Sequence, residues 1–171
     1  MRIGGGAVSI ADVTDRTARD LGFVRPFWLN EIRAGRAFSG ETSLAASVGN
    51  NSHLQLFNPV GSGITIVVKR IVTTPLADQS VEVRQHNTAL TTLGMNGINL
   101  LSGGAAAIGE VRSQQNASRL GTRFRQLSLL ANVPFDFAKD WDIELGAGEG
   151  VQLIGASTNV GIIGFYEWSE L

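Results

Sequence analysis

Residues 53–71, HLQLFNPVGSGITIVVKRI, place two apolar runs on either side of a turn that contains glycine and proline. In the first run, leucines alternate with His53 and Gln55, which is the period-two pattern of a strand buried on one face. The second run, ITIVVKRIV at residues 64–72, is rich in β-branched residues, which favour a central position in a sheet. The stretch therefore predicts two consecutive β-strands.

The turn between these runs, NPVGSG at residues 58–63, could be a phosphate-binding loop or a plain connection. A phosphate-binding loop leads into a helix whose N-terminal N–H groups face the anion, and its motif ends in Gly-Lys-Ser/Thr. Here a strand follows and no Gly-Lys is present, so we expect a hairpin connection. The same reasoning applies to LGAGEGVQLIG, where Gly146, Gly148 and Gly150 should permit the positive φ of a tight turn.

The β pattern continues to the C-terminus without a convincing amphipathic helix after residue 50. Turn residues separate further strand-like runs, which are SVEVRQHN (80–87), AIGEVRSQ (107–114), RFRQLSLLANV (123–133), WDIEL (141–145), GVQLIGAS (150–157) and VGIIGFYEWSEL (160–171). About eight short strands predict an all-β, two-sheet antiparallel sandwich, for which a jelly roll is the natural closed arrangement. The least regular part, residues 91–107, could turn a small hairpin at Asn96–Gly97 or form a long loop.

Residues 1–47 differ from the rest, and we expect them to form an N-terminal arm ahead of a sandwich domain at residues 48–171. The stretch TDRTARDLG at residues 14–22 could form two helical turns. The following segment, FVRPFWLNEIRAGRAFSG at residues 23–40, mixes aromatic residues with arginine, the residue types enriched at interface hot spots. It could dock on neighbouring subunits, or it could form a helix and loop packed on the domain's own core.

The last predicted strand carries apolar bulk on both faces, because Phe165 alternates with Tyr166 and Trp168. A strand exposed on one side would carry more polar residues there. We therefore expect one face in the sandwich core, and the face of Tyr166 and Trp168 against the arm or a neighbouring subunit. The residues expected at an interface are Arg16, Arg19, Phe27, Trp28, Arg33, Arg36, Phe38, Tyr166 and Trp168.

Composition limits the classes of partner. The chain has 171 residues, with 14 basic against 15 acidic, so it has no net field that would attract nucleic acid or an anionic membrane. It contains no cysteine, no apolar run near the ~20 residues of a membrane span, and no apolar core of a signal peptide. We expect a protein made in a cytoplasm, with neither nucleic acid nor membrane as its partner.

No pattern predicts catalysis, a metal site or a cofactor. The two histidines, His53 and His86, lack a metal-binding spacing, and their places at strand ends suggest exposed or edge positions. No Gly-x-Ser-x-Gly motif is present. Four carboxylates at residues 136–144 lack the spacing of an EF-hand and favour a solvated strand rim. The C-terminal aromatic residues could form a sugar platform, although packing in a core or interface is their usual role. The sequence therefore predicts a protein that is not an enzyme.

Several of these stretches, in this order, resemble small virion structural proteins of tailed bacteriophages. In that family a strand ends in an Asn-Pro-x-Gly-Ser-Gly turn, here residues 58–63. The chain then closes with a glycine-rich turn (146–150), a strand, an Asn (Asn159) and a final strand with an aromatic-x-Trp-x-Glu ending (166–170). VTDRTARDLGFV, at residues 13–24, also resembles an Asp-Arg-x-x-Arg-x-Leu-Gly-x-Val stretch near the start of many phage structural proteins.

The resemblance implies a jelly-roll or similar β-sandwich that assembles on a virion as a capsid decoration, or cement, protein. Its partner would be the major capsid protein or another virion protein, and its location the virion, after synthesis in the host bacterial cytoplasm. We expect a homo-oligomer, with a trimer as the preferred arrangement. Because members of the family also occur in fibres, baseplates and necks, the alternative is a tail, neck or fibre component with a receptor- or glycan-binding sandwich.

Overall fold

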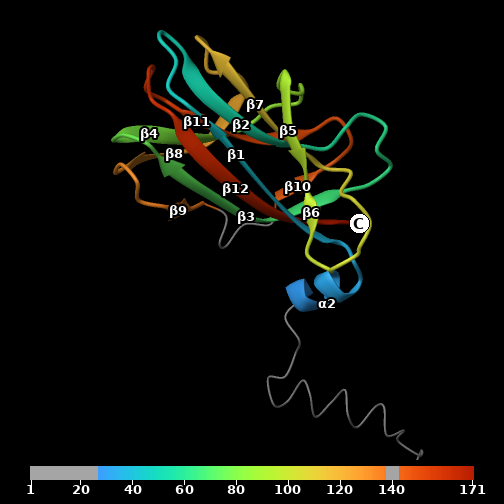
Figure 1. The fold of residues 1–171 in the computed structure, drawn as a ribbon. Coiled ribbons are helices and arrows are strands. Elements are labelled where there is room, and N and C mark those ends of the chain that lie inside the picture. Colours follow the sequence, from blue (N-terminus) through green and yellow to red (C-terminus); the bar gives the residue numbers. More distant parts are fainter. Residues whose placement is uncertain (1–26, 138–142) are drawn as a thin grey trace, which may run out of the picture.

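The protein folds into two packed antiparallel β-sheets, as a computed structural model describes for residues 27–137 and 143–171 (Figure 1). A short helix, α2 (Phe27–Arg33), precedes the first strand. In chain order the strands are β1 (Ala37–Leu44), β2 (Asn51–Phe57), β3 (Ile66–Pro75), β4 (Gln79–Gln85), β5 (Thr92–Asn96), β6 (Ile98–Asn99), β7 (Glu110–Asn116), β8 (Thr122–Leu129), β9 (Phe135–Asp136), β10 (Ile143–Leu145), β11 (Gly150–Gly155) and β12 (Ile162–Glu170).

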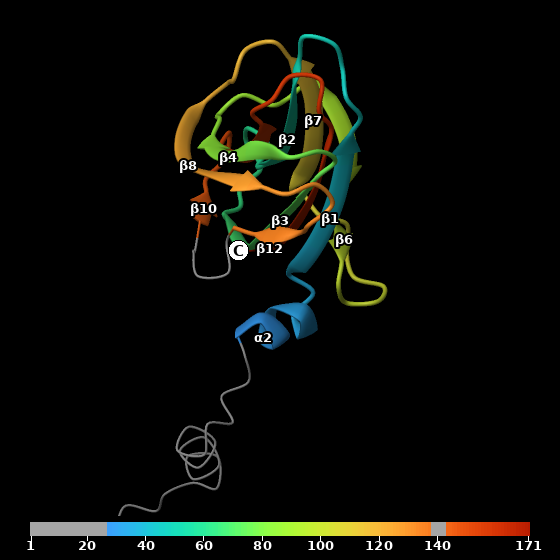
Figure 2. The ribbon, with the colours of Figure 1, turned by 90° about the vertical axis from the view of Figure 1, so that its left-hand side faces the viewer.

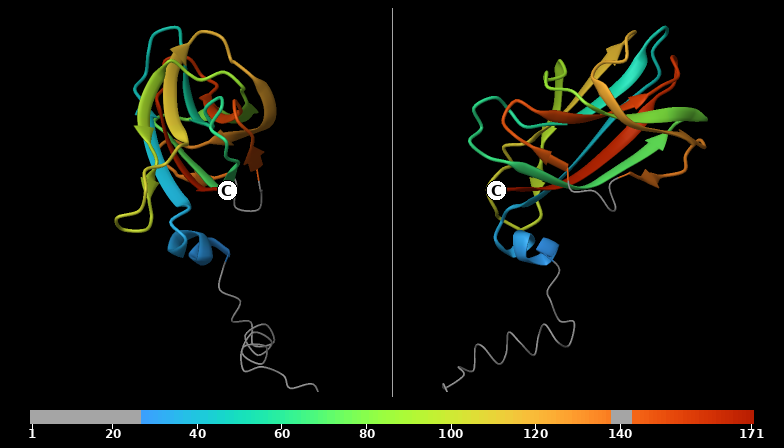
Figure 3. Two further views of the ribbon diagram at one scale, coloured as in Figure 1. Left: turned by 90° about the vertical axis from the view of Figure 1, so that its right-hand side faces the viewer. Right: turned by 180° about the vertical axis from the view of Figure 1, so that it is seen from behind.

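The two sheets divide these strands between them. Sheet A has the order β10–β3–β12–β1–β6, with β9 also paired to β3, and sheet B has the order β5–β7–β2–β11–β4–β8. All of these pairs are antiparallel. The sheets face each other (Figure 3), and α2 lies beyond one end of the sandwich (Figure 2). The expected all-β antiparallel sandwich is confirmed.

Every run that the sequence predicts to be a strand contains one, namely β2, β3, β4, β7, β8, β10, β11 and β12. Of the remaining strands, β1 and β9 were not expected, whereas β5 and β6 flank Asn96–Gly97, where a small hairpin was one of the two alternatives. Strand β1 pairs along its whole length with β12, from Ala37 opposite Ser169 to Leu44 opposite Ile162. The boundary between arm and sandwich at residue 47 is therefore wrong, since residues 37–44 belong to the sandwich.

The core lies between the sheets and is filled by aliphatic and aromatic side chains from both. Its largest fully buried members include Trp168, Tyr166, Phe137, Leu54, Leu56, Ile66, Ile71, Leu153 and Ile162. The expected alternation of β2 places the two leucines in this core, but the strand is not half-buried as predicted, because His53 and Gln55 on its other face are also buried. Loops cover that outer face, and Gln55 Nε2 donates to the carbonyl of His86 at 2.8 Å.

Trp168 connects the core to the segment between β5 and β7. Its ring stacks on Phe38 of β1, with the ring centroids 6.0 Å apart. The ring also occupies the space that a side chain at Gly97 would need, so the backbone there can approach only because residue 97 is glycine. At Gly109, a Cβ would lie 2.9 Å from the indole nitrogen. The indole therefore fixes the path of residues 97–109.

The glycine-rich turns connect the two sheets, so the expected hairpin at residues 58–63 is wrong. This turn joins β2 of sheet B to β3 of sheet A. Buried Asn58 holds it, because its Nδ2 donates to the carbonyls of Ile64 at 2.9 Å and Leu145 at 3.0 Å. The turn between β10 and β11 also changes sheet, and of its glycines only Gly148 has a positive φ, at 83°.

The irregular segment also differs from both expectations, since the chain leaves β5 in sheet B and enters β6 in sheet A directly after Asn96–Gly97. This step is a crossing between sheets, neither a hairpin nor a long loop. Within residues 27–137 and 143–171, no helix is long and apolar enough to cross a bilayer.

Candidate functional site

Several of the residues expected at an interface are not among those that the structure describes. Arg16 and Arg19 fall outside the described residues, as does the expected helix at residues 14–22. Phe27 and Trp28 form the first turn of α2, but their side chains are also outside the described part. For these residues the interface assignment stays a prediction.

Arg33 and Arg36 are exposed where α2 meets β1. Arg36, which follows the helix, pairs with Glu31 of α2, with Nε–Oε2 at 2.8 Å and Nη2–Oε1 at 2.9 Å. This hydrogen bonding lowers the pKa of Glu31. The pair joins the helix to the start of β1, because Arg36 N also donates to the carbonyl of Glu31 at 2.9 Å.

Phe38, Tyr166 and Trp168 are core residues, so their assignment to an interface is wrong. Tyr166 and Trp168 are fully buried within the single chain, and Phe38 stacks on Trp168. The prediction reversed the two faces of β12, because the face with Tyr166 and Trp168 turns toward sheet B. Ile163 and Phe165 are partly exposed on the opposite face.

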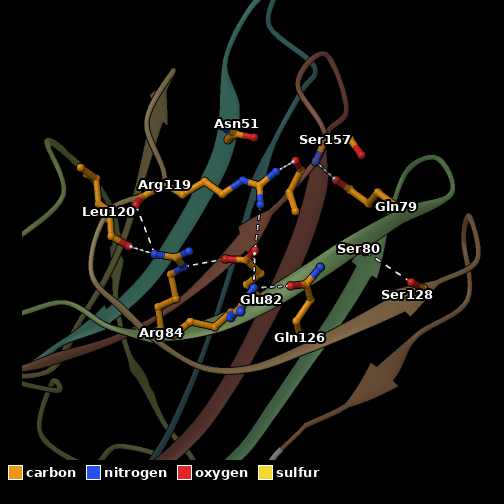
Figure 4. Close-up of polar contacts among 12 residues, drawn as sticks. Asn51, Gln79, Ser80, Glu82, Arg84, Arg119, Leu120, Gln126, Ser128 and Ser157 are labelled. Carbon is orange, nitrogen blue, oxygen red and sulfur yellow. Dashed lines mark hydrogen bonds and ion pairs between the residues drawn. The ribbon is translucent and has the colours of Figure 1, made fainter.

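A polar cluster lies on the outer face of sheet B, around the buried carboxylate of Glu82 (Figure 4). Arg84 Nε donates to it at 2.6 Å and Arg119 Nη1 at 2.9 Å, while Arg123 Nη1 lies 3.6 Å away. Arg84 Nη1 also donates to the carbonyl of Gly121 at 2.7 Å. These contacts fasten the loop of residues 117–121 over the sheet, so the cluster has a structural role.

His53 lies under the same loop, and its expected exposed or edge position is wrong, because the residue is buried and β2 lies inside sheet B. Its Nδ1 is 3.4 Å from Gln152 Oε1, and Gln152 Nε2 donates to the carbonyl of Leu120 at 2.6 Å. Burial lowers the pKa of His53, and burial also lowers the pKa of His86. Within the described residues, no group of three or more His, Cys, Asp or Glu side chains could hold a metal ion.

The acidic cluster is only partly within the described chain. Asp136 pairs with Arg70, with Nε–Oδ2 at 2.8 Å, and Glu144 is exposed on β10. Asp140 and Asp142 lie outside the described residues. The two carboxylates that are described therefore have the surroundings of a strand rim.

A group of exposed aliphatic side chains lies at the α2 end of the sandwich, and we call it the aliphatic platform. Its members are exposed by 36% to 61% and are Ile98, Leu100, Leu101 and Ile108. They come from β6, the loop after it and the loop before β7 (Figure 1), and Gly97 N donates to the carbonyl of Gly109 at 3.4 Å, which holds these segments side by side. Isolated exposed aliphatic side chains are common, whereas a group of them marks an interaction site.

Hydrogen bonds hold the backbone of the platform in place. The carboxylate of Glu170 accepts from the N–H of Ile108 at 3.0 Å and of Gly109 at 2.8 Å, and from the indole of Trp168 at 3.1 Å. Leu100 N donates to the carbonyl of Ala37 at 2.9 Å. The exposed side chains therefore project from a backbone tied to sheet A.

The platform was not predicted from the sequence, although the stretch GINLLSGG at residues 97–104 contains a pattern that could have indicated it. Consecutive leucines between an asparagine and a glycine pair have no alternation that would place them in a core. Such residues are candidates for exposed apolar positions in a loop.

No family model, no curated protein and no solved structure matches this chain. Its function must therefore be argued from the fold and the geometry of its surface.

Proposed function

We propose that this chain is a structural protein of a bacteriophage virion, which decorates the capsid as a homo-oligomer and stabilises the shell through contacts between subunits. The observation that carries the proposal is the aliphatic platform at the end of the sandwich where the N-terminal residues join. A rigid sandwich with exposed aliphatic side chains at one end suits a subunit whose surface is covered by other protein.

The strand order supports a jelly roll as the fold for this role. Strands β1–β12–β3–β10 of sheet A and β2–β11–β4–β8 of sheet B have the interleaved order expected when two Greek keys form a double sheet. Strands β5, β6 and β7 would then be an insertion between β4 and β8. This insertion, with the loops between its strands, supplies all four platform residues.

Assembly on a lattice explains how modest contacts could stabilise a shell. Covering exposed aliphatic surface gains about 25 cal/mol per Å², and each ordered side chain costs some of that gain. A single contact of this kind is weak. When many copies bind to one shell, each contact raises the effective concentration of the others, so the assembly is more stable than any one contact.

The proposal is tested by mass spectrometry and electron microscopy of the phage particles that carry this chain. A copy number that follows the number of shell subunits, with density on the outside of the capsid, is expected. A low copy number confined to the tail, neck or fibre would support the alternative, a receptor- or glycan-binding component. Absence from purified particles would overturn both.

The glycan-binding alternative requires aromatic faces that a sugar can reach. Among the side chains that the structure describes, the large exposed hydrophobic residues include one aromatic, Phe124 on β8. Tyr166, Trp168 and Phe137 are buried in the core. The described surface therefore favours binding to protein over stacking against a sugar ring.

A further inference from the structure

We infer that the aliphatic platform is the docking site for residues 1–26 of a neighbouring copy of this chain. The inference deepens the proposed assembly role and depends on it for its biological setting. It concerns a contact between two copies, however, and it can be tested on the purified protein without any particle.

The platform is organised before anything binds to it. Leu100 N donates to the carbonyl of Ala37 at 2.9 Å, and Ile108 N donates to the carboxylate of Glu170 at 3.0 Å, so both segments of the platform are tied to sheet A. Asn99 Nδ2 donates to the carbonyls of Gly35 and Ala105, both at 2.9 Å, and so fixes the loop that carries the two leucines. Little backbone ordering entropy is therefore lost when a partner covers these side chains.

The occupant is indicated by the length and position of the chain that precedes α2. Residues 1–26 could reach up to about 90 Å if fully extended, which is far more than the width of the platform. The segment contains aliphatic and aromatic residues that can cover an aliphatic surface, which are Ile3, Val8, Ile10, Val13, Leu21, Phe23 and Val24. It is joined through α2 to Gly35, which lies beside the platform, because a Cβ at Gly35 would lie 3.5 Å from Leu101 Cδ2.

The direction of α2 favours a neighbouring copy over the same chain. The C-terminal end of α2 adjoins the platform, whereas its N-terminal end lies on the side away from β6 and the loop after it (Figures 2 and 3). A helix of seven residues is about 10 Å long. The preceding chain would have to turn back past this helix to cover its own platform, but it can reach the platform of a neighbour directly. Such a head-to-tail contact closes into a ring if the rotation between subunits allows it.

Introduced cysteines provide a clean test, because the natural chain has none. One full-length variant carries Leu101→Cys on the platform, and a second carries Ile10→Cys or Leu21→Cys in the N-terminal segment. When the two variants are mixed and oxidised, we expect a disulfide-linked pair that contains one chain of each kind. The matched control is Leu130→Cys, which is also exposed but lies after β8, away from the platform.

The platform variant should cross-link roughly tenfold or more faster than the control, because docking raises the effective concentration of the two thiols. Adding Ile98→Ser and Leu100→Ser to the Leu101→Cys chain should reduce this rate to that of the control, with the circular dichroism spectrum unchanged.

Two results would overturn the inference. One is equal cross-linking at positions 101 and 130. The other is a double variant, Leu21→Cys with Leu101→Cys, that forms its disulfide only within one chain, which would show that the segment covers its own platform. Neither result bears on whether the protein is found in virions. Conversely, absence from particles would remove the proposed function while the cross-linking result would stand.

Discussion

Replacing Trp168 by alanine tests whether the residue belongs to the core of one chain. A buried aromatic side chain removes roughly 150–250 Å² from water, which corresponds to about 4–6 kcal/mol at 25 cal/mol per Å². Alanine retains part of this, and truncations of buried Phe or Trp cost about 3–5 kcal/mol. Trp168 is fully buried and also donates to Glu170, so we expect a loss near the upper end, about 5 kcal/mol.

A second variant separates the packing from the hydrogen bond. Trp168→Phe keeps most of the apolar ring but removes the indole N–H, while Glu170 keeps the N–H groups of Ile108 and Gly109. We expect it to cost about 1–3 kcal/mol. The exposed Leu130→Ala serves as the control and should change the free energy of unfolding by no more than about 0.5 kcal/mol.

The assay is urea denaturation followed by circular dichroism, together with the native molar mass from light scattering. For Trp168→Ala we expect a lower urea midpoint at every protein concentration. If the variant instead unfolds at the wild-type midpoint but loses molar mass, the ring lies between subunits, and the assignment of Trp168 to the core is refuted.

Three further predictions concern the same structure. Gly97→Ala should cost about 2–3 kcal/mol by forcing the indole of Trp168 to move, and in a Trp168→Ala background most of this penalty should disappear in a double-mutant cycle, with a remainder from Ala107, whose Cβ would lie 3.0 Å away. Glu82→Gln should lower the free energy of unfolding by about 2–3 kcal/mol and speed amide exchange at residues 117–121, whereas the exposed Glu144→Gln should do neither. Burial lowers the pKa of His53, so below about pH 6.5 the unfolded chain binds a proton that the folded chain does not. Stability should therefore fall as the pH drops from 6.5, and His53→Gln should flatten that fall; an unchanged pH profile would contradict it.

Periodicity predicted the strands that carry regular apolar residues, but it could not predict what covers their outer faces. In β2 the leucines and the polar residues alternate as expected, yet Gln55 is buried because residues distant in sequence cover it. Strand β1, AFSGETSL, was missed because its short polar residues resemble a loop, and pairing with β12 outweighs this weak local preference.

The local sequence also could not predict which face of β12 turns inward or which sheets the turns connect. Both faces of β12 carry large apolar residues, so the pattern itself is symmetric with respect to which face turns inward. The turn at residues 58–63 has the composition of a hairpin, but the same residue types suit a crossing between sheets. Only the pairing of β3 with β12, rather than with β2, distinguishes the two.

Trp168 and Glu170 connect the core of the sandwich to the surface that we propose as a docking site. The indole fills the space beside Gly97 and donates to Glu170, and the same carboxylate holds the backbone of Ile108 in the platform. Packing in the core and the position of the platform are therefore set by the same two side chains. Trp168 would therefore support assembly through this surface by fixing the backbone beneath it, although the buried indole does not itself contact the partner.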